Sequence, residues 1–358
     1  MRRIIAVLSL IFFTQSVLFA QEYLWKADFD YFFDNTEYSK SSFFDSETMQ
    51  GIWLKPLAGI TWDDHKHAVF GGVNLLKLPG TDEVLDKVDV TMYYQYKTPK
   101  VLFRAGAFPR NEVLGNYNNF FFKDSVNNYL PLMRGVFWQI GDEISFFNLW
   151  LDWTSYATAI TREKFFFGFS GKATKGLAFA DFQSYVYHNA NTRPRTEGEG
   201  VHENIQLQST LGLQYANENS FEGLVAAGVL MGYERDRFTD ELHKPVGFVA
   251  RADAEYWGIG TKNTLYIGDP RMRFFERYGG DLYWGTQFLR GKSYLESEWY
   301  VRLIESERVK ARFNLNMHFS EGNLLFQQMF TVSATIGNFN TQRNPKGPFP
   351  WMKVFNIE

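Results

Sequence analysis

The chain has 358 residues, of which 45% are hydrophobic, 18% aromatic and 22% charged, and its formal net charge is −3. This composition argues against intrinsic disorder, and the slight acidic excess argues against nucleic-acid binding. Beyond the N-terminal segment, no stretch approaches the roughly 20 apolar residues that a membrane-spanning helix needs. The sequence contains no cysteine, so the fold must be stable without disulfides. These properties favour one large all-β domain over two ordinary domains.

The N-terminal segment is typical of a secretory signal peptide. Arg2 and Arg3 form a basic start, and an apolar run follows from Ile4 to Phe13. The run is short for a membrane anchor, so we expect export and cleavage. The expected organisation is a signal peptide over residues 1–20 and a single barrel domain over residues 21–358.

After the signal peptide, apolar and polar residues alternate with a period of two. In the segment from His202, for example, Leu207 and Leu211 alternate with Gln206 and Gln208. This pattern indicates strands with one apolar and one polar face. The same alternation occurs in three further segments, Trp25–Tyr31, Val246–Trp257 and Val309–Phe319.

Two features assign the apolar faces to lipid rather than to a soluble core. First, Phe221 and Tyr233 bracket the smaller Val225, Ala227 and Val229, which resembles the aromatic girdles at the two interfaces of a membrane. Second, short and long connections alternate along the chain. Short turns on one side and long loops on the other are typical of an outer-membrane barrel.

The sequence therefore predicts an all-β protein, a transmembrane antiparallel β-barrel of about 16–18 strands with short periplasmic turns and longer extracellular loops. Counting a long loop at Asp269–Gly280, a short turn at Arg290–Ser293 and a last strand at Trp351–Ile357 gives 18 strands, with 16 as the alternative. Only Glu305–Arg308 breaks the rhythm, because it is short where a long loop is due. Closure of the barrel leaves no unpaired strand edge in lipid.

With its signal peptide, girdled strands and unequal connections, the mature chain resembles Gram-negative outer-membrane porins and their relatives. The resemblance implies an outer-membrane location, contact with outer-membrane lipid and lipopolysaccharide, and passive diffusion of small hydrophilic solutes through the lumen. It leaves open whether the protein forms a homo-oligomer.

Charged residues on the polar strand faces are expected to point into the lumen, because an Arg or Lys facing lipid at the midplane costs about 2–4 kcal/mol. They could line a water-filled channel or form a closed network of ion pairs. The width of a barrel of this size favours the channel. The expected pore-lining residues are Lys26, Asp28, Asp30, Lys55, Arg104, Asp152, Asp181, Arg251, Asp253, Glu255, Glu296, Glu298, Arg302, Lys310 and Arg312.

The connection Pro109–Arg134 is the longest between two predicted strands. In porins of similar build, a loop at this position folds into the barrel and narrows it. The alternative is an external loop that packs over the rim through the aromatic run Phe120–Phe122. If the loop enters the barrel, its charged residues would face the solute, and these are Arg110, Glu112, Lys123, Asp124 and Arg134.

Motifs for chemistry are weak in this sequence. His65 and His67 could share a metal ion, but they lie in a predicted solvated turn. Glu296 and Glu298 could act as paired carboxylates, but a structural role is favoured. There is no nucleophile elbow, Walker loop or dinucleotide fingerprint. We therefore predict a non-enzymatic channel without metal or cofactor. The alternatives are a non-conducting structural or receptor-like barrel and, less favoured, a lipid-modifying enzyme.

Overall fold

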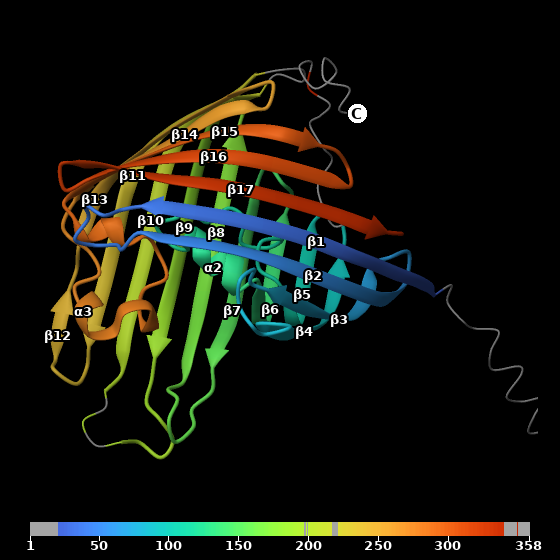
Figure 1. Ribbon diagram of the computed structural model, residues 1–358, viewed down its shortest axis with the longest axis horizontal. Helices are drawn as coiled ribbons and strands as arrows, with labels where there is room; N and C mark the ends of the chain where they lie inside the picture. Colours follow the sequence, from blue (N-terminus) through green and yellow to red (C-terminus); the bar gives the residue numbers. More distant parts are fainter. Residues whose placement is uncertain (1–20, 197, 199, 217–220, 340–348, 350–358) are drawn as a thin grey trace, which may run out of the picture.

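The computed structural model describes residues 21–196, 198, 200–216, 221–339 and 349. Within these residues, sixteen antiparallel strands form a closed barrel, and β12 is a short additional strand on its rim. The barrel closes because β1 (Glu22–Glu37) pairs with β2 (Glu47–Trp62) on one side and with β17 (Asn323–Gly337) on the other. Figure 1 shows the resulting ring of strands. The predicted all-β barrel is confirmed.

The elements between these three strands follow a simple meander, in which neighbours along the chain are neighbours in the wall. In chain order they are β3 (His67–Lys77), β4 (Lys87–Lys97), β5 (Val101–Pro109), α2 (Asp124–Tyr129), β6 (Leu132–Gly141), β7 (Phe146–Ser155), β8 (Lys164–Lys175), β9 (Ala178–Asn189), β10 (His202–Ala216), β11 (Phe221–Asp236), β12 (Glu241–His243), β13 (Val246–Tyr256), β14 (Ile259–Gly268), α3 (Phe275–Tyr278), η2 (Gly279–Asp281), η3 (Gln287–Arg290), β15 (Ser293–Glu305) and β16 (Val309–Ser320).

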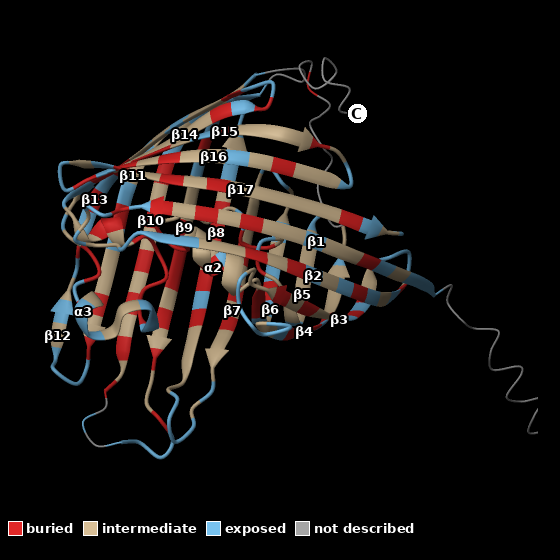
Figure 2. Ribbon diagram, viewed as in Figure 1, coloured by how far each residue is buried: buried red, intermediate tan, exposed pale blue. Residues whose placement is uncertain are grey.

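Side chains alternate between the two faces of the wall, as the sequence pattern predicts. In β10, Gln206 and Gln208 are buried inside the barrel, whereas Leu211 and Leu213 are exposed on its outer surface. The strands in Figure 2 accordingly change between buried and exposed along their length. An exposed apolar exterior and a buried polar interior are the reverse of a soluble protein and suit a barrel in lipid.

The connections also divide as predicted, but one region changes the strand count. Asp269–Gly280 and Arg290–Ser293 belong to a single loop, 269–292, because the residues between them form short helical turns and no strand. Glu305–Arg308 is then an ordinary turn at the periplasmic end. The connection between β16 and β17, residues 321–322, is short although it lies at the extracellular end, where the other described connections are long. The described residues therefore form 16 wall strands, which is the alternative count, and not 18. The predicted last strand, Trp351–Ile357, lies outside the described residues.

Two loops fold into the barrel and fill much of its extracellular half. They are the connection between β5 and β6, called the inserted loop (residues 110–131), and the loop 269–292. Phe120, Phe121 and Phe122 of the inserted loop are at most 3% exposed and belong to one large aromatic core. The core also includes Trp150 of the wall and Trp284 of the second loop. Among the described residues, no helix has the length and apolarity to cross a bilayer.

Candidate functional site around helix α2

The inserted loop is anchored where it leaves the wall. The Arg110 guanidinium donates to Asp152 of β7, with 2.6 Å between Nη2 and Oδ2, and the two side chains are 2% and 1% exposed. A buried pair of this kind is stable only when both charges remain partnered. The loop therefore enters the lumen at a defined point beside β7.

From this anchor the inserted loop crosses the lumen and contacts strands on opposite sides. These contacts place the loop across the barrel and not over its rim. The amide groups of Asn118 and Asn119 donate to Gln208 of β10 and Glu296 of β15, at 3.1 and 2.8 Å. The indole of Trp53 in β2 donates to the Asn128 carbonyl at 2.8 Å, and Lys87 of β4 donates to the Tyr129 carbonyl at 2.8 Å.

Helix α2 is the short helical turn of the inserted loop, and it packs against β1. The rings of Tyr129 and Phe32 meet edge to face with 5.5 Å between centroids. The helix begins at Asp124, directly after Lys123. An acidic residue in the first helical turn is electrostatically favourable. The packing therefore holds Lys123 and Asp124 inside the extracellular half of the barrel.

Acidic groups surround Asp124. Burial, reinforced by the charges of Asp34 and Glu298, raises the pKa of the Asp124 carboxyl to about 7, although Lys262 and Arg312 act in the opposite direction. Asp124 is neither fully buried nor exposed, and a carboxyl whose pKa lies near 7 can gain or lose a proton at neutral pH. Such a carboxyl meets the first requirement of a general base or acid.

Lys123 is perturbed in the opposite sense. Burial lowers the pKa of its ammonium group, and the nearby Glu47 carboxylate partly offsets this effect. The ammonium also lies 5.8 Å from the ring centroid of Phe44, which is a cation–π distance. A cationic side chain, Lys123, and a carboxyl, Asp124, thus follow each other in the chain, and both are partly buried.

A hydrogen-bonded chain of polar residues leads from β1 to β15 beside α2. Asp34 accepts a bond of 2.8 Å from the Gln327 amide, and the Gln327 carbonyl oxygen lies 3.2 Å from His318 Nε2. The other ring nitrogen of His318 lies 2.7 Å from the Tyr294 hydroxyl. Both ring nitrogens of His318 are therefore occupied, and the buried Ser320 hydroxyl makes no hydrogen bond to this ring. Asp124 is the better candidate for acid–base chemistry.

The described residues contain no group of three or more side chains suited to hold a metal ion. His65 and His67 contact different partners. His65 Nε2 lies 3.6 Å from Glu22, whereas His67 Nδ1 lies 2.7 Å from the Tyr94 hydroxyl. The structure does not bring the two imidazoles together on a common ligand.

The charged residues expected to line the lumen lie on the inner strand faces, and most of them are paired. Asp152 pairs with Arg110, Asp181 accepts a bond from Thr210, and Glu296 accepts one from Asn119. The remaining pairs are Lys26–Asp28 at 2.7 Å, Lys55–Asp30 at 2.5 Å, Arg104–Glu112 at 2.7 Å, Arg302–Glu255 at 2.8 Å, Lys310–Glu305 at 3.8 Å, Arg251–Asp253 and Arg312–Glu298.

The residues expected in the constriction divide into two groups. Arg110, Glu112, Lys123 and Asp124 lie in the inserted loop, inside the barrel. Arg134 differs, because it is the third residue of β6 and its guanidinium binds Asp89 of β4 at 2.9 Å. Its side chain is 44% exposed. Arg134 therefore belongs to the wall and not to the loop that crosses the lumen.

The family assignment rests on a match that extends over all the strands of the barrel. Residues 20–340 match the family described as Lipid A 3'-O-deacylase-type. The chain belongs to this family. A deacylase family is a family of enzymes, so the prediction of a non-enzymatic protein is wrong. The prediction relied on the absence of sequence motifs. The groups around α2 come from β1, β2, β15, β16, β17 and a loop, and no linear motif could reveal them.

Solved structures of low sequence identity share the fold. The anion-selective porin from Comamonas acidovorans has a TM-score of 0.53 and 9% identity, and the alignment covers 88% of this chain and 100% of the porin. Outer-membrane expressed OmpT of Vibrio cholerae has a TM-score of 0.51 and 9% identity, over 88% of this chain and 98% of OmpT. These likenesses show an outer-membrane barrel of the porin type and nothing finer. No curated protein matches the chain.

Sequence reasoning selected Lys123, Asp124 and Glu296 but missed Asp34, His318 and Gln327. Alternation places all three missed residues on inner faces, as it does many other polar residues. Their distinguishing property is that they meet beside α2. Only the paths of β1, β16 and β17 around the closed wall create that proximity.

Proposed function

We propose that this protein is an outer-membrane hydrolase that removes an ester-linked acyl chain from a lipid A-type glycolipid. The observation that carries the proposal is the position of Asp124, which begins a helix inside the barrel of a member of this deacylase family. Burial beside the acidic Asp34 and Glu298 raises the pKa of this carboxyl to about 7. Lipid A occupies the membrane leaflet on the extracellular side. The acid–base group and the substrate would therefore lie at the same depth.

In the proposed reaction, the Asp124 carboxylate takes a proton from a water molecule as the water oxygen attacks the ester carbonyl carbon. Charge develops on the carbonyl oxygen, and the ammonium of Lys123 is the nearby group suited to stabilise it. The intermediate then expels the sugar alkoxide, which receives the proton from Asp124. The products are a free fatty acid and the deacylated lipid, and Asp124 returns to its carboxylate form.

The experiment is a hydrolysis assay with the full chain reconstituted into vesicles that contain lipid A. Mass spectrometry of the lipid fraction should show release of a fatty acid by the wild-type protein. Asp124→Asn keeps the size of the side chain but cannot accept a proton, so the rate should fall by roughly 10²-fold or more. Asp142→Asn, in an exposed turn at the periplasmic end, is the matched control and should retain the activity.

Two results would contradict the proposal. The first is that the folded wild-type protein releases no fatty acid from lipid A. The second is that Asp124→Asn hydrolyses the lipid as fast as the Asp142→Asn control. As part of the same proposal, we assign residues 1–20 to an export signal and the barrel to the outer membrane of a Gram-negative bacterium.

Passive diffusion of small hydrophilic solutes is the second candidate function. The observation in its favour is that several ion pairs of the lumen wall are partly exposed, among them Arg312–Glu298 at 30% and 16%. The inserted loop counts against a wide channel, because it reaches opposite walls. Single-channel recording in a planar bilayer separates the two candidates, since a hydrolase with a closed lumen would show no ohmic conductance steps.

A further inference from the structure

The extracellular end of the β5–β6 hairpin separates from both of its neighbours. Strands β5 and β6 remain paired up to Pro109 and Leu132. In contrast, the register between β4 and β5 ends at Met92–Ala107, and the register between β6 and β7 ends at Gly135–Asp152. Each register therefore stops two or three residues short of the hairpin end. The wall has a notch on either side of this hairpin, at its extracellular end.

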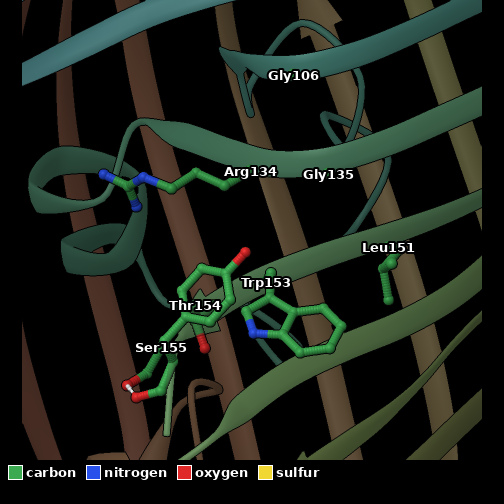
Figure 3. Close-up of a pocket in the computed structure, with 8 residues that line it drawn as sticks. Gly106, Arg134, Gly135, Leu151, Trp153, Thr154 and Ser155 are labelled. Carbon is green, nitrogen blue, oxygen red and sulfur yellow. Dashed lines mark hydrogen bonds between the residues drawn. The ribbon is translucent and has the colours of Figure 1, made fainter. Parts of the chain in front are cut away.

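A cavity of about 550 Å³ occupies the notch between β6 and β7. Its lining includes Leu151, Trp153, Thr154, Ser155 and Tyr156 from the end of β7 and the residue that follows it (Figure 3). Leu151 and Trp153 alternate with Trp150 and Asp152, which are buried on the lumen side. The cavity is consequently on the lipid-facing side, and its volume lies in the usual range of small-molecule sites.

Two glycines of the lining lie very close to the neighbouring strands. Gly106 and Gly135 contribute to the lining, and a Cβ atom at either position would approach a backbone carbonyl oxygen of an adjacent strand to 2.2 Å. Gly106 also has a φ of +126°, which disfavours any other residue. These two positions of the lining therefore favour glycine over any residue with a side chain.

Arg134 brings a positive charge to the lining of the cavity. Arg134 and Lys87 share a single carboxylate, Asp89, at 2.9 and 3.1 Å. The Arg134 side chain remains 44% exposed, so its guanidinium can take a second anion. In addition, the buried indole N–H of Trp153 has no acceptor among the described residues. An anionic group with several oxygen acceptors would give the Arg134 guanidinium a second partner.

We propose that this cavity binds one molecule of an anionic, phosphate-bearing lipid of the outer leaflet. An acyl chain lies along Leu151 and Trp153, and the phosphate pairs with Arg134. Lys87 also donates to the Tyr129 carbonyl at the end of α2. Through Asp89, Arg134 of the lipid site is therefore linked to Lys87 and to the candidate active site. Lipid binding at this cavity does not require that the protein is a hydrolase.

The test is native mass spectrometry of the full-length folded protein in detergent, titrated with two lipids that have identical acyl chains. Dipalmitoyl phosphatidic acid provides an anionic phosphate monoester, and dipalmitoyl phosphatidylcholine provides a zwitterionic headgroup. The wild-type protein should retain phosphatidic acid with about tenfold higher affinity than phosphatidylcholine, because Arg134 forms a charge-assisted pair with the phosphate.

Two substitutions probe the two halves of the site. Arg134→Gln should abolish the preference for phosphatidic acid, whereas Leu151→Trp should fill the cavity and reduce retention of both lipids by about tenfold. Arg235→Gln is the matched control, because Arg235 is also partly exposed at the extracellular end and pairs with a single carboxylate, Asp240. The control should behave like the wild-type protein.

The proposal is overturned if Leu151→Trp retains both lipids as the wild type does, or if Arg134→Gln keeps the preference. The change of electrophoretic mobility on heating verifies that each variant is a folded barrel. If Leu151→Trp does not fold, Ser155→Trp fills the same cavity from the rim and replaces it. Because the readout is bound lipid, a protein that binds lipid but releases no fatty acid would disprove only the proposed hydrolysis.

Discussion

Arg110 and Asp152 join the inserted loop to the barrel wall through a buried ion pair of 2.6 Å. Asp152 has a second role, because its other carboxylate oxygen accepts the backbone N–H of Arg134 at 2.8 Å. One carboxylate thus connects the loop that carries α2 to the β6–β7 notch beside the lipid cavity. The candidate active site and the proposed lipid site depend on the same anchor.

Replacing Asp152 by Ala should strongly destabilise the barrel. The substitution leaves the Arg110 guanidinium buried without a counter-charge, which typically costs about 3–5 kcal/mol. Equilibrium unfolding in denaturant, with the protein in lipid vesicles, measures the change. The control is Asp142→Asn, which removes the exposed pair with Lys100 and should leave the unfolding midpoint unchanged. Equal effects of the two substitutions would show that the inserted loop is not anchored as described.

The raised pKa of Asp124 predicts a pH dependence of stability. The folded protein keeps the Asp124 proton up to about pH 7, whereas the unfolded chain releases it near the ordinary aspartate pKa of 3.8. Between these values the folded state binds more protons, so the free energy of unfolding should fall as the pH rises. Asp124→Asn removes this contribution and should resist denaturant better than the wild type at about pH 8, with little difference near pH 4. If the free energy of unfolding of both proteins changes with pH in the same way, the raised pKa of Asp124 is refuted.

The two faces of the wall should differ in their tolerance of charge. Ala252 of β13 is exposed on the outer surface, so Ala252→Arg places a charge in lipid at a cost of about 2–4 kcal/mol and should impair assembly. Thr264 of β14 faces the lumen at a similar depth and is the cross-strand neighbour of Glu296. Thr264→Arg should therefore assemble normally. The heat-dependent change in electrophoretic mobility reports assembly, and equal yields of both variants would contradict the assigned faces.

The sequence alone also suggests that Gln208→Arg is tolerated, because Gln208 lies on a polar face. The structure changes this expectation. Gln208 is only 4% exposed and accepts a hydrogen bond from Asn118 of the inserted loop. An Arg at this position would displace the loop, so we now expect a loss of stability in the same unfolding assay.

Deleting residues 115–128 tests whether the inserted loop blocks the lumen. The deletion removes the aromatic run and most of α2, and the remaining wall retains its strand pairing. Conductance through a planar bilayer should then increase from the wild-type level, and any lipid hydrolysis should disappear because Asp124 is lost. Unchanged conductance in a folded deletion variant would show that other residues close the lumen.

The architecture of the wall follows from a pattern along the chain. Residues such as Leu211 and Gln208 alternate with a period of two, and this period is local, so it can be read without knowledge of the fold. The unequal connections likewise identified the two ends of the barrel. The loop 269–292 misled the count, since its residues resemble a strand in composition but pack as short helical turns against the inserted loop.

The contents of the barrel interior depend on contacts between segments that are distant along the chain. Asp34, Asp124 and Glu296 are far apart along the chain and meet because the wall closes and the inserted loop crosses it. Burial, which raises the pKa of Asp124, depends on atoms from several strands and is not encoded in any short motif. The same holds for the lipid cavity, because it arises where strand registers end. A local pattern specifies the faces of a strand, but a site assembled from many strands requires the closed barrel.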